Sequence, residues 1–255
     1  MIFTKLGLFR FVKGYDQPVH SLKSALRKCG DVDGSLIVLP EGFNIGRTYY
    51  PKGFNIGGNN LATVVGRRDP CVLRCLQDLA GDYGTTFVAG LIIDPPDAPS
   101  VPSKPFCSSY LIDGAHPPVL LCRKMGDDGS GNYTRCEEHY DVKNPYRYGD
   151  DVFIASLLCL DLTDETLTIQ QRLLRLKSAL AVASCPQKIL CVPANMGSQN
   201  GAPEIAKSWP GAYFILANSL RSQCRSLIAK GEVTLLEDDW GDDNAVRLCT
   251  LVRES

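Results

Sequence analysis

The sequence predicts an α/β fold in which one domain spans residues 1–255. Short apolar segments of strand length alternate along the chain with segments of helical periodicity, which is the order typical of layered α/β proteins. No repeat, low-complexity tract or linker divides the 255 residues. At the centre, residues 151–161 (DVFIASLLCLD) form an apolar run typical of a strand buried on both faces, with Cys159 where that strand leaves the sheet.

The first third of the chain alternates strands and helices. Residues 2–11 are predicted as a strand, and 18–29 as an amphipathic helix with its apolar residues on one stripe. Residues 35–39 (SLIVL) predict a buried strand that ends at Glu41. A second helix is predicted to start at Asp69-Pro70 and to end at Gly81. Its expected inward residues are Val72, Cys75, Leu76 and Leu79.

The remaining elements continue the alternation. Residues 107–112 and 119–123 predict a hairpin, and 126–148 a long polar loop. After Asp161, Thr163 or Asp164 is expected to cap a helix. That helix would turn Ile169, Leu173, Leu176 and Leu180 inward. The other predicted elements are strands over 85–93, 188–192, 212–217, 232–236 and 245–252, and a short helix over 205–209.

Composition excludes several classes of protein. The chain is 44% hydrophobic and 22% charged, as ordinary soluble globular proteins are. A formal net charge of -1 leaves no basic footprint for nucleic acid. Lys5, Arg10 and Lys13 interrupt the first residues, unlike a signal peptide, and no apolar run is long enough to span a bilayer. We therefore expect a cytoplasmic protein without nucleic-acid or membrane partners.

The cysteine pattern points to reduced thiols. There are 11 cysteines, and without a secretion signal a disulfide framework is not expected. No C-x-x-C pair occurs, and Cys71 and Cys75 lack a second pair of ligands at metal spacing. The sequence therefore predicts no metal and no cofactor, and it offers little support for a thiol-based redox protein.

Three chemically useful side chains follow apolar strands. They are Glu41, Lys124 and Cys159. Taken singly, each has a structural explanation: a solvated loop carboxylate, a lysine that protects a hairpin edge, and a small buried core residue. Together they supply a base, a cation for developing negative charge, and a nucleophile. None of the histidines, which are His20, His116 and His139, follows a strand as a catalytic histidine would.

The segments that carry these residues resemble the three signature segments of the nitrilase (carbon–nitrogen hydrolase) superfamily. The segments are LIVLPE with Glu41, CRK with Lys124, and SLLCLD with Cys159, and their order matches. FVAGLII and AYFILAN also resemble strands of that family, so the resemblance extends from Phe3 to about Leu236. It implies a nitrilase-like α-β-β-α four-layer sandwich.

The resemblance also implies roles. Glu41 would be the general base, Lys124 would stabilise the tetrahedral intermediate, and Cys159 would be the nucleophile, with the backbone N–H of Leu160 sharing the oxyanion role. A second glutamate would be Glu138, with Glu137 as the alternative. The implied activity is thiol-dependent hydrolysis of a non-peptide carbon–nitrogen bond in a small amide, carbamoyl or nitrile substrate, through a thioester on Cys159.

The same resemblance implies at least a homodimer that pairs through the helix after Cys159. Leu167, Leu174 and Ala181 would form an apolar stripe on the outer face of that helix.

Two departures from the family pattern leave an alternative open. Leu160 stands where the family usually has an aromatic residue, and Trp209-Pro210-Gly211 stands where many members have a Glu-Asn pair. A catalytically inactive nitrilase-like protein that binds or acts as a scaffold would tolerate both, because the pocket rather than the fold decides function. The residues that bind substrate stay unassigned, although the loops at 44–60, 126–148 and 195–201 are expected to set specificity.

Overall fold

The structure of the chain is a computed structural model. It describes residues 2–12, 17–44, 71–93, 105–126, 136, 141–195, 202–209, 211–218, 225–238 and 241–252, with the backbone alone at 160, 202 and 203.

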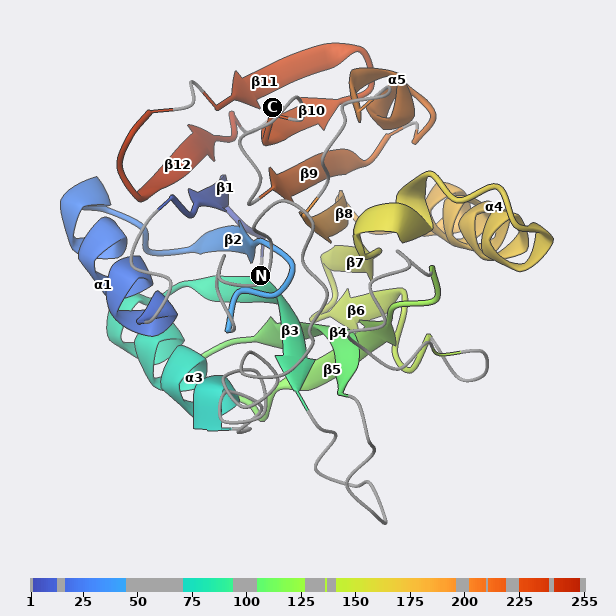
Figure 1. Ribbon diagram of the computed structural model, residues 1–255. Coiled ribbons are helices and arrows are strands. Elements are labelled where there is room, and N and C mark those ends of the chain that lie inside the picture. Colours follow the sequence, from blue (N-terminus) through green and yellow to red (C-terminus); the bar gives the residue numbers. More distant parts are fainter. Residues whose placement is uncertain are drawn as a thin grey trace.

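Two six-stranded sheets form the centre of the molecule (Figure 1). The first has the order β12-β1-β2-β3-β4-β5, and the second has the order β11-β10-β9-β8-β7-β6. The strands of the first sheet are β1 (Lys5–Arg10), β2 (Ser35–Leu39), β3 (Thr86–Ile93), β4 (Phe106–Ile112), β5 (Val119–Arg123) and β12 (Ala245–Thr250). Those of the second are β6 (Tyr146–Tyr148), β7 (Val152–Ser156), β8 (Gln187–Ala194), β9 (Tyr213–Asn218), β10 (Leu227–Lys230) and β11 (Val233–Glu237).

Helices cover the outer face of each sheet, which gives four layers. α1 (Pro18–Cys29) and α3 (Cys71–Tyr83) pack on the first sheet, while α4 (Leu167–Val182) and the short α5 (Ala202–Lys207) pack on the second (Figure 1). One apolar cluster fills each helix–sheet layer and a third lies between the sheets, where Val38 of β2 and Ile154 of β7 belong to the same cluster. The predicted α-β-β-α sandwich is confirmed.

The strands that carry the candidate residues end at one edge of the sandwich. β1, β2 and β3 are parallel neighbours in the first sheet, as β7, β8 and β9 are in the second. β5 ends at the same edge as β3, because it is related to β3 by two antiparallel pairings. At this edge the sheets touch directly, since the backbone N–H of Glu41 donates to the carbonyl of Ala194, 3.4 Å away.

The sequence located α3 correctly but ended it too early. The helix continues through Gly81 to Tyr83, and Gly84, with φ of +61°, follows it. Gly114 is the glycine that permits close packing here, because a Cβ at Gly114 would lie 2.3 Å from the Cα of Gly81, whereas a Cβ at Gly81 would lie 3.6 Å from the Cα of Gly114. The prediction that Cys75 points inward is also wrong, since Cys75 is exposed.

α4 begins later than predicted. It starts at Leu167 after Thr166, while Asp164 accepts the N–H of Thr166 at 2.8 Å, so neither Thr163 nor Asp164 is the cap residue. The four predicted inward residues of this helix are buried, as expected. β6 and β10 were not predicted, because strands of 3 and 4 residues are too short to show a period.

Within the described residues, no helix combines the length and the apolar character needed to cross a membrane.

Candidate active site

Glu41 lies in the turn after β2, held against the neighbouring strand. Its side chain is buried. A Cβ at Gly90 of β3 would lie 2.8 Å from the Cα of Glu41 and 2.7 Å from the Cβ of Pro193. Only a glycine therefore allows the Glu41 turn and the end of β8 to approach β3 this closely. Gly90 was not recognised in the sequence, where it is one glycine within an apolar strand.

Lys124 follows β5 and reaches Glu41 from across the first sheet. Its backbone N–H donates to the carbonyl of Cys107 in β4 at 2.8 Å. Its Nζ lies 2.7 Å from Glu41 Oε1, and only 1% of the lysine side chain is exposed. A buried ammonium requires a partner of opposite charge, and the Glu41 carboxylate is that partner.

Cys159 begins a short 3-10 helix, η2 (Cys159–Leu162), three residues after the end of β7. Its φ is 45°, in the left-handed region. A residue with a Cβ is strained there, and this conformation costs on the order of 1–3 kcal/mol. Strain of this kind clusters at functional sites, where the surrounding structure maintains it. The thiol is buried, at 4% exposure.

The three side chains interact electrostatically. Burial, and then the negative charge of Glu41, raise the pKa of the Cys159 thiol above its usual range; Lys124 and the backbone N–H of Asn195 act in the opposite direction. The thiol therefore keeps its proton at neutral pH. Lys124 does not hold Cys159 as a thiolate, because burial and Glu41 outweigh the lysine.

A nucleophilic role for Cys159 would therefore require a base at the moment of attack rather than before it. Glu41 Oε2 is buried and makes no well-aligned hydrogen bond to any residue in the described part of the chain. The nearby Cys159 thiol nevertheless interacts with this carboxylate, which further raises the pKa of the thiol. The geometry thus places a carboxylate oxygen with unused acceptor capacity close to a protonated thiol.

A buried ion network supports the site from behind. The Asp161 carboxylate accepts the N–H groups of Met125 and Gly126, at 3.1 and 2.7 Å, and Arg172 Nη1 at 2.6 Å. Arg172, on α4, also lies 2.9 Å from Asp141. The network joins the segment after Lys124 to the helix turn that starts with Cys159, so it ties two parts of the site together.

Sequence reasoning assigned no role to Arg172 or Asp141. Arg172 is three residues after Ile169 and four before Leu176, so a charged residue interrupts the apolar stripe of a predicted helix. That interruption is the signal that could have identified a buried ion pair. Asp141, in the predicted polar loop, carries no comparable signal.

Other predicted residues are only partly covered by the structure. The backbone of Leu160 lies in η2, and its side chain is not described. Glu137 and Glu138 lie outside the described residues. Within the described ranges, no group of three or more His, Cys, Asp or Glu side chains could hold a metal ion.

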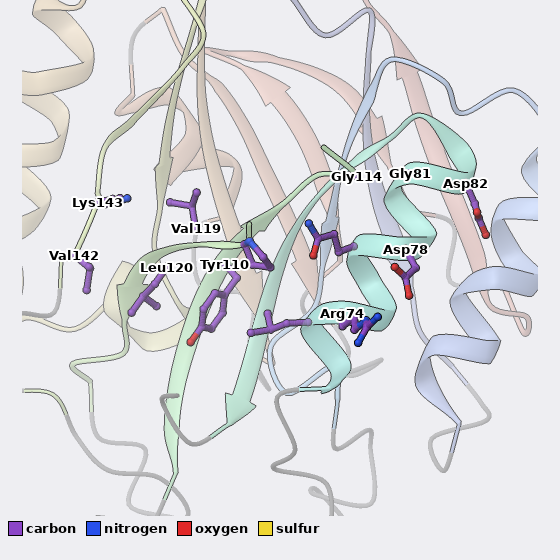
Figure 2. Close-up of a pocket in the computed structure, with 13 residues that line it drawn as sticks. Arg74, Asp78, Gly81, Asp82, Tyr110, Gly114, Val119, Leu120, Val142 and Lys143 are labelled. Atoms are coloured by element: carbon purple, nitrogen blue, oxygen red, sulfur yellow. The ribbon is translucent and has the colours of Figure 1, made fainter. Parts of the chain in front are cut away.

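A groove lies on the helix-covered face of the first sheet, apart from the three candidate residues. It runs between α3 and the β4–β5 hairpin, where Arg74, Asp78, Tyr110 and Lys143 contribute to its lining (Figure 2). Tyr110 belongs to the helix-side cluster of that sheet, whereas Glu41 approaches Pro193 of the second sheet. The groove contains none of the three candidate residues, so it is not where their chemistry would occur.

Comparisons with known proteins identify the fold. A scan against protein-family models gives no match, and neither does a search of curated proteins. Solved structures do match. An amidase from Nesterenkonia sp. is 16% identical with a TM-score of 0.65, and the similarity covers 98% of this chain and 90% of the amidase. The chain has the nitrilase-superfamily fold.

Two further solved structures with the nitrilase fold are similar to this chain. Saccharomyces cerevisiae Nit3, a member of branch 10 of the nitrilase superfamily, is 16% identical over 98% of this chain and 90% of Nit3, with a TM-score of 0.63. A carbon-nitrogen hydrolase from Helicobacter pylori G27 is 14% identical over 97% of this chain and 89% of its own, with a TM-score of 0.61. In a mutant of the Nesterenkonia amidase, the acetamide moiety of fluoroacetamide is covalently added at the active-site cysteine.

Proposed function

We propose that this chain hydrolyses a non-peptide carbon–nitrogen bond, with Cys159 as nucleophile, Glu41 as general base and Lys124 as stabiliser of the intermediate. The observation that carries the proposal is the buried Lys124–Glu41 pair, with Nζ and Oε1 2.7 Å apart, beside the strained Cys159, whose thiol pKa is raised by burial and by Glu41. The nitrilase-superfamily fold supports it, because the amidase and carbon-nitrogen hydrolase that share this fold carry out this class of reaction.

In the first half of the proposed reaction, Cys159 Sγ attacks the carbonyl carbon of an amide while Glu41 takes the thiol proton. A carbon–sulfur bond forms and the carbonyl oxygen becomes negative. The Lys124 ammonium and the backbone N–H of Leu160 stabilise that charge. When the intermediate collapses, the carbon–nitrogen bond breaks, and the amine leaves with the proton that Glu41 returns.

In the second half, water hydrolyses the thioester. Glu41 takes a proton from water as the water oxygen attacks the acyl carbon, and the carbon–sulfur bond then breaks. The proton returns from Glu41 to the Cys159 sulfur. One amide and one water become one carboxylic acid and one amine, so the proposed cycle needs neither a metal nor an organic cofactor.

The proposed substrate is a small amide. Structures of the Nesterenkonia amidase contain butyramide and acrylamide, which makes small aliphatic amides the first choice for a substrate panel. Carbamoyl compounds and nitriles are the other substrate classes to include. We also propose that Glu138, or Glu137 in its place, is a second glutamate of the site.

Ammonia release from such a panel tests the proposal. The wild-type protein should release ammonia from at least one amide, and Cys159→Ala should abolish the release while leaving the circular dichroism spectrum unchanged. If no compound is hydrolysed and mass spectrometry finds no acyl group on Cys159, the hydrolase proposal fails. The nitrilase-like binding or scaffold protein would then be the better account.

A further inference from the structure

A second buried thiol contacts the carboxylate of Glu41. Cys107 lies in β4 with 1% of its surface exposed, and its Sγ–H donates to Glu41 Oε1 over 3.3 Å. Side chains alternate along a strand, and Ser109, two residues further on, hydrogen-bonds Ser156 of the second sheet. Cys107 therefore points between the sheets, on the same face as Ser109. Its carbonyl also accepts the backbone N–H of Lys124, so Cys107 touches two members of the site.

The two oxygens of Glu41 differ in their partners. Oε1 accepts both Lys124 Nζ, at 2.7 Å, and the Cys107 thiol. Oε2 makes no well-aligned hydrogen bond to a described residue. Burial, and next the Glu41 charge, raise the pKa of the Cys107 thiol well above its usual range. Cys107 therefore keeps its proton and stays a donor while Glu41 is charged.

We propose that Cys107 is a positioning residue for the general base: with Lys124, it fixes Oε1 so that Oε2 is the oxygen that accepts the Cys159 proton. This inference rests on the proposed function, because it assigns an orientation to the base of that reaction. It separates the two carboxylate oxygens into one that anchors and one that reacts, and it gives a core cysteine a role in the rate rather than in packing alone.

In the described part of the chain, few other groups near Glu41 could hold this orientation. Among the described residues, the titratable groups that face the carboxylate are Lys124 from the end of β5, Cys107 from β4 and Cys159 from η2. A single anchor permits the carboxylate to rotate about its terminal bond, since that torsion is soft. A second donor on the same oxygen restricts the rotation, which is the contribution assigned to Cys107.

The first test compares two substitutions at Cys107 with a matched control. Cys107→Ala removes the donor, whereas Cys107→Ser keeps one. Cys191→Ala is the control, because Cys191 is an equally buried cysteine that belongs to the core between the sheets. With the best amide of the panel, Cys107→Ala should lower kcat about fivefold, the size expected for one modest hydrogen bond, with KM nearly unchanged.

Recovery of kcat in Cys107→Ser would distinguish a positioning role of Cys107 from a packing role. Cys107→Ser should recover most of kcat, and Cys191→Ala should match the wild type, although urea unfolding should show a loss of stability in both alanine variants. If Cys107→Ser is as slow as Cys107→Ala, or if Cys107→Ala keeps the wild-type kcat, the positioning role is wrong.

A second readout does not depend on turnover. The rate at which iodoacetamide alkylates Cys159 should be measured against pH by peptide mapping. Without the Cys107 donor, the Glu41 charge is less neutralised, so the midpoint of the profile should move to higher pH in Cys107→Ala and stay in place in Cys107→Ser. If no amide is hydrolysed, the proposed function fails while this profile still decides the inference, and coincident wild-type and Cys107→Ala profiles would overturn it.

Discussion

At the residue scale, the site combines a buried acid–base pair with a thiol that is not ionised in advance. Glu41 and Lys124 neutralise each other across 2.7 Å, which allows both to be buried. Cys159 shares this environment, and its pKa is raised by burial and by Glu41. The raised pKa predicts that the thiol reacts slowly with general reagents at neutral pH. Under the proposed function, reaction depends on a substrate that recruits the base.

The pH dependence of Cys159 alkylation follows from the sign of these effects. Because the Glu41 charge raises the pKa of Cys159, Glu41→Gln should lower that pKa, and iodoacetamide should label Cys159 at lower pH than in the wild type. Amide hydrolysis should nearly vanish in the same variant, since the base is lost. A label that appears only at higher pH than in the wild type would contradict the assigned electrostatics.

Lys124 is expected to act on the intermediate rather than only to pair with Glu41. Lys124→Ala should lower kcat by about a hundredfold or more, the size expected when one partner of the oxyanion is lost. Lys124→Arg should not restore the rate, because a planar guanidinium does not replace a compact ammonium in a fully buried position. Steady-state kinetics on a confirmed substrate measure kcat for both variants. An unchanged kcat in Lys124→Ala would contradict the role of Lys124 in stabilising the intermediate.

At the element scale, strand ends could be read from the sequence, whereas contacts between elements could not. Glu41, Lys124 and Cys159 became candidate site residues because each follows a short apolar strand. Cys107 looks like an ordinary core residue, because alternation alone does not tell which carboxylate lies opposite it. Gly81 was misread for a similar reason: the sequence shows a helix breaker, while the structure shows a close contact with Gly114.

The Asp161–Arg172 pair should stabilise the segment that carries Cys159. Both side chains have no exposed surface and lie 2.6 Å apart. Asp161→Asn leaves Arg172 with less compensating charge, so the free energy of unfolding should fall by about 3 kcal/mol in a urea titration. Asp150→Asn is the control, because Asp150 forms an exposed pair with Arg147 and its loss should leave stability unchanged. Equal stability of the two variants would show that the buried pair contributes little.

At the scale of the whole molecule, the site is assembled from both sheets. Glu41 and Lys124 come from the first sheet and Cys159 from the second, and Gly90 allows the Glu41 turn and the end of β8 to meet. The order of elements predicted the layers, because alternation of strands and helices limits the possible architectures. It could not predict how closely the two sheets approach, which depends on side-chain size at single positions such as Gly90.

We propose that the outer face of α4 is the interface of the expected homodimer. Leu167 and Leu174 are 74% and 67% exposed, and Ala181 is also exposed. If this stripe is an interface, sedimentation at micromolar concentration should give a dimer, and Leu174→Asp should give a monomer. Val233→Asp, on an exposed apolar residue of β11, is the control and should leave the dimer intact. A wild-type monomer would contradict the proposal.

Reaction with fluoroacetamide, followed by peptide mapping, tests the central claim most directly. Exposure alone would direct a reagent to Cys71 and Cys75, because both are exposed while Cys159 is buried with a raised pKa. Fluoroacetamide is a weak alkylating agent that has the shape of a small amide, so it requires a site that binds amides and activates a thiol. We predict that the native protein is labelled at Cys159 alone. Labelling of Cys71 or Cys75 ahead of Cys159 would contradict the assignment of the nucleophile.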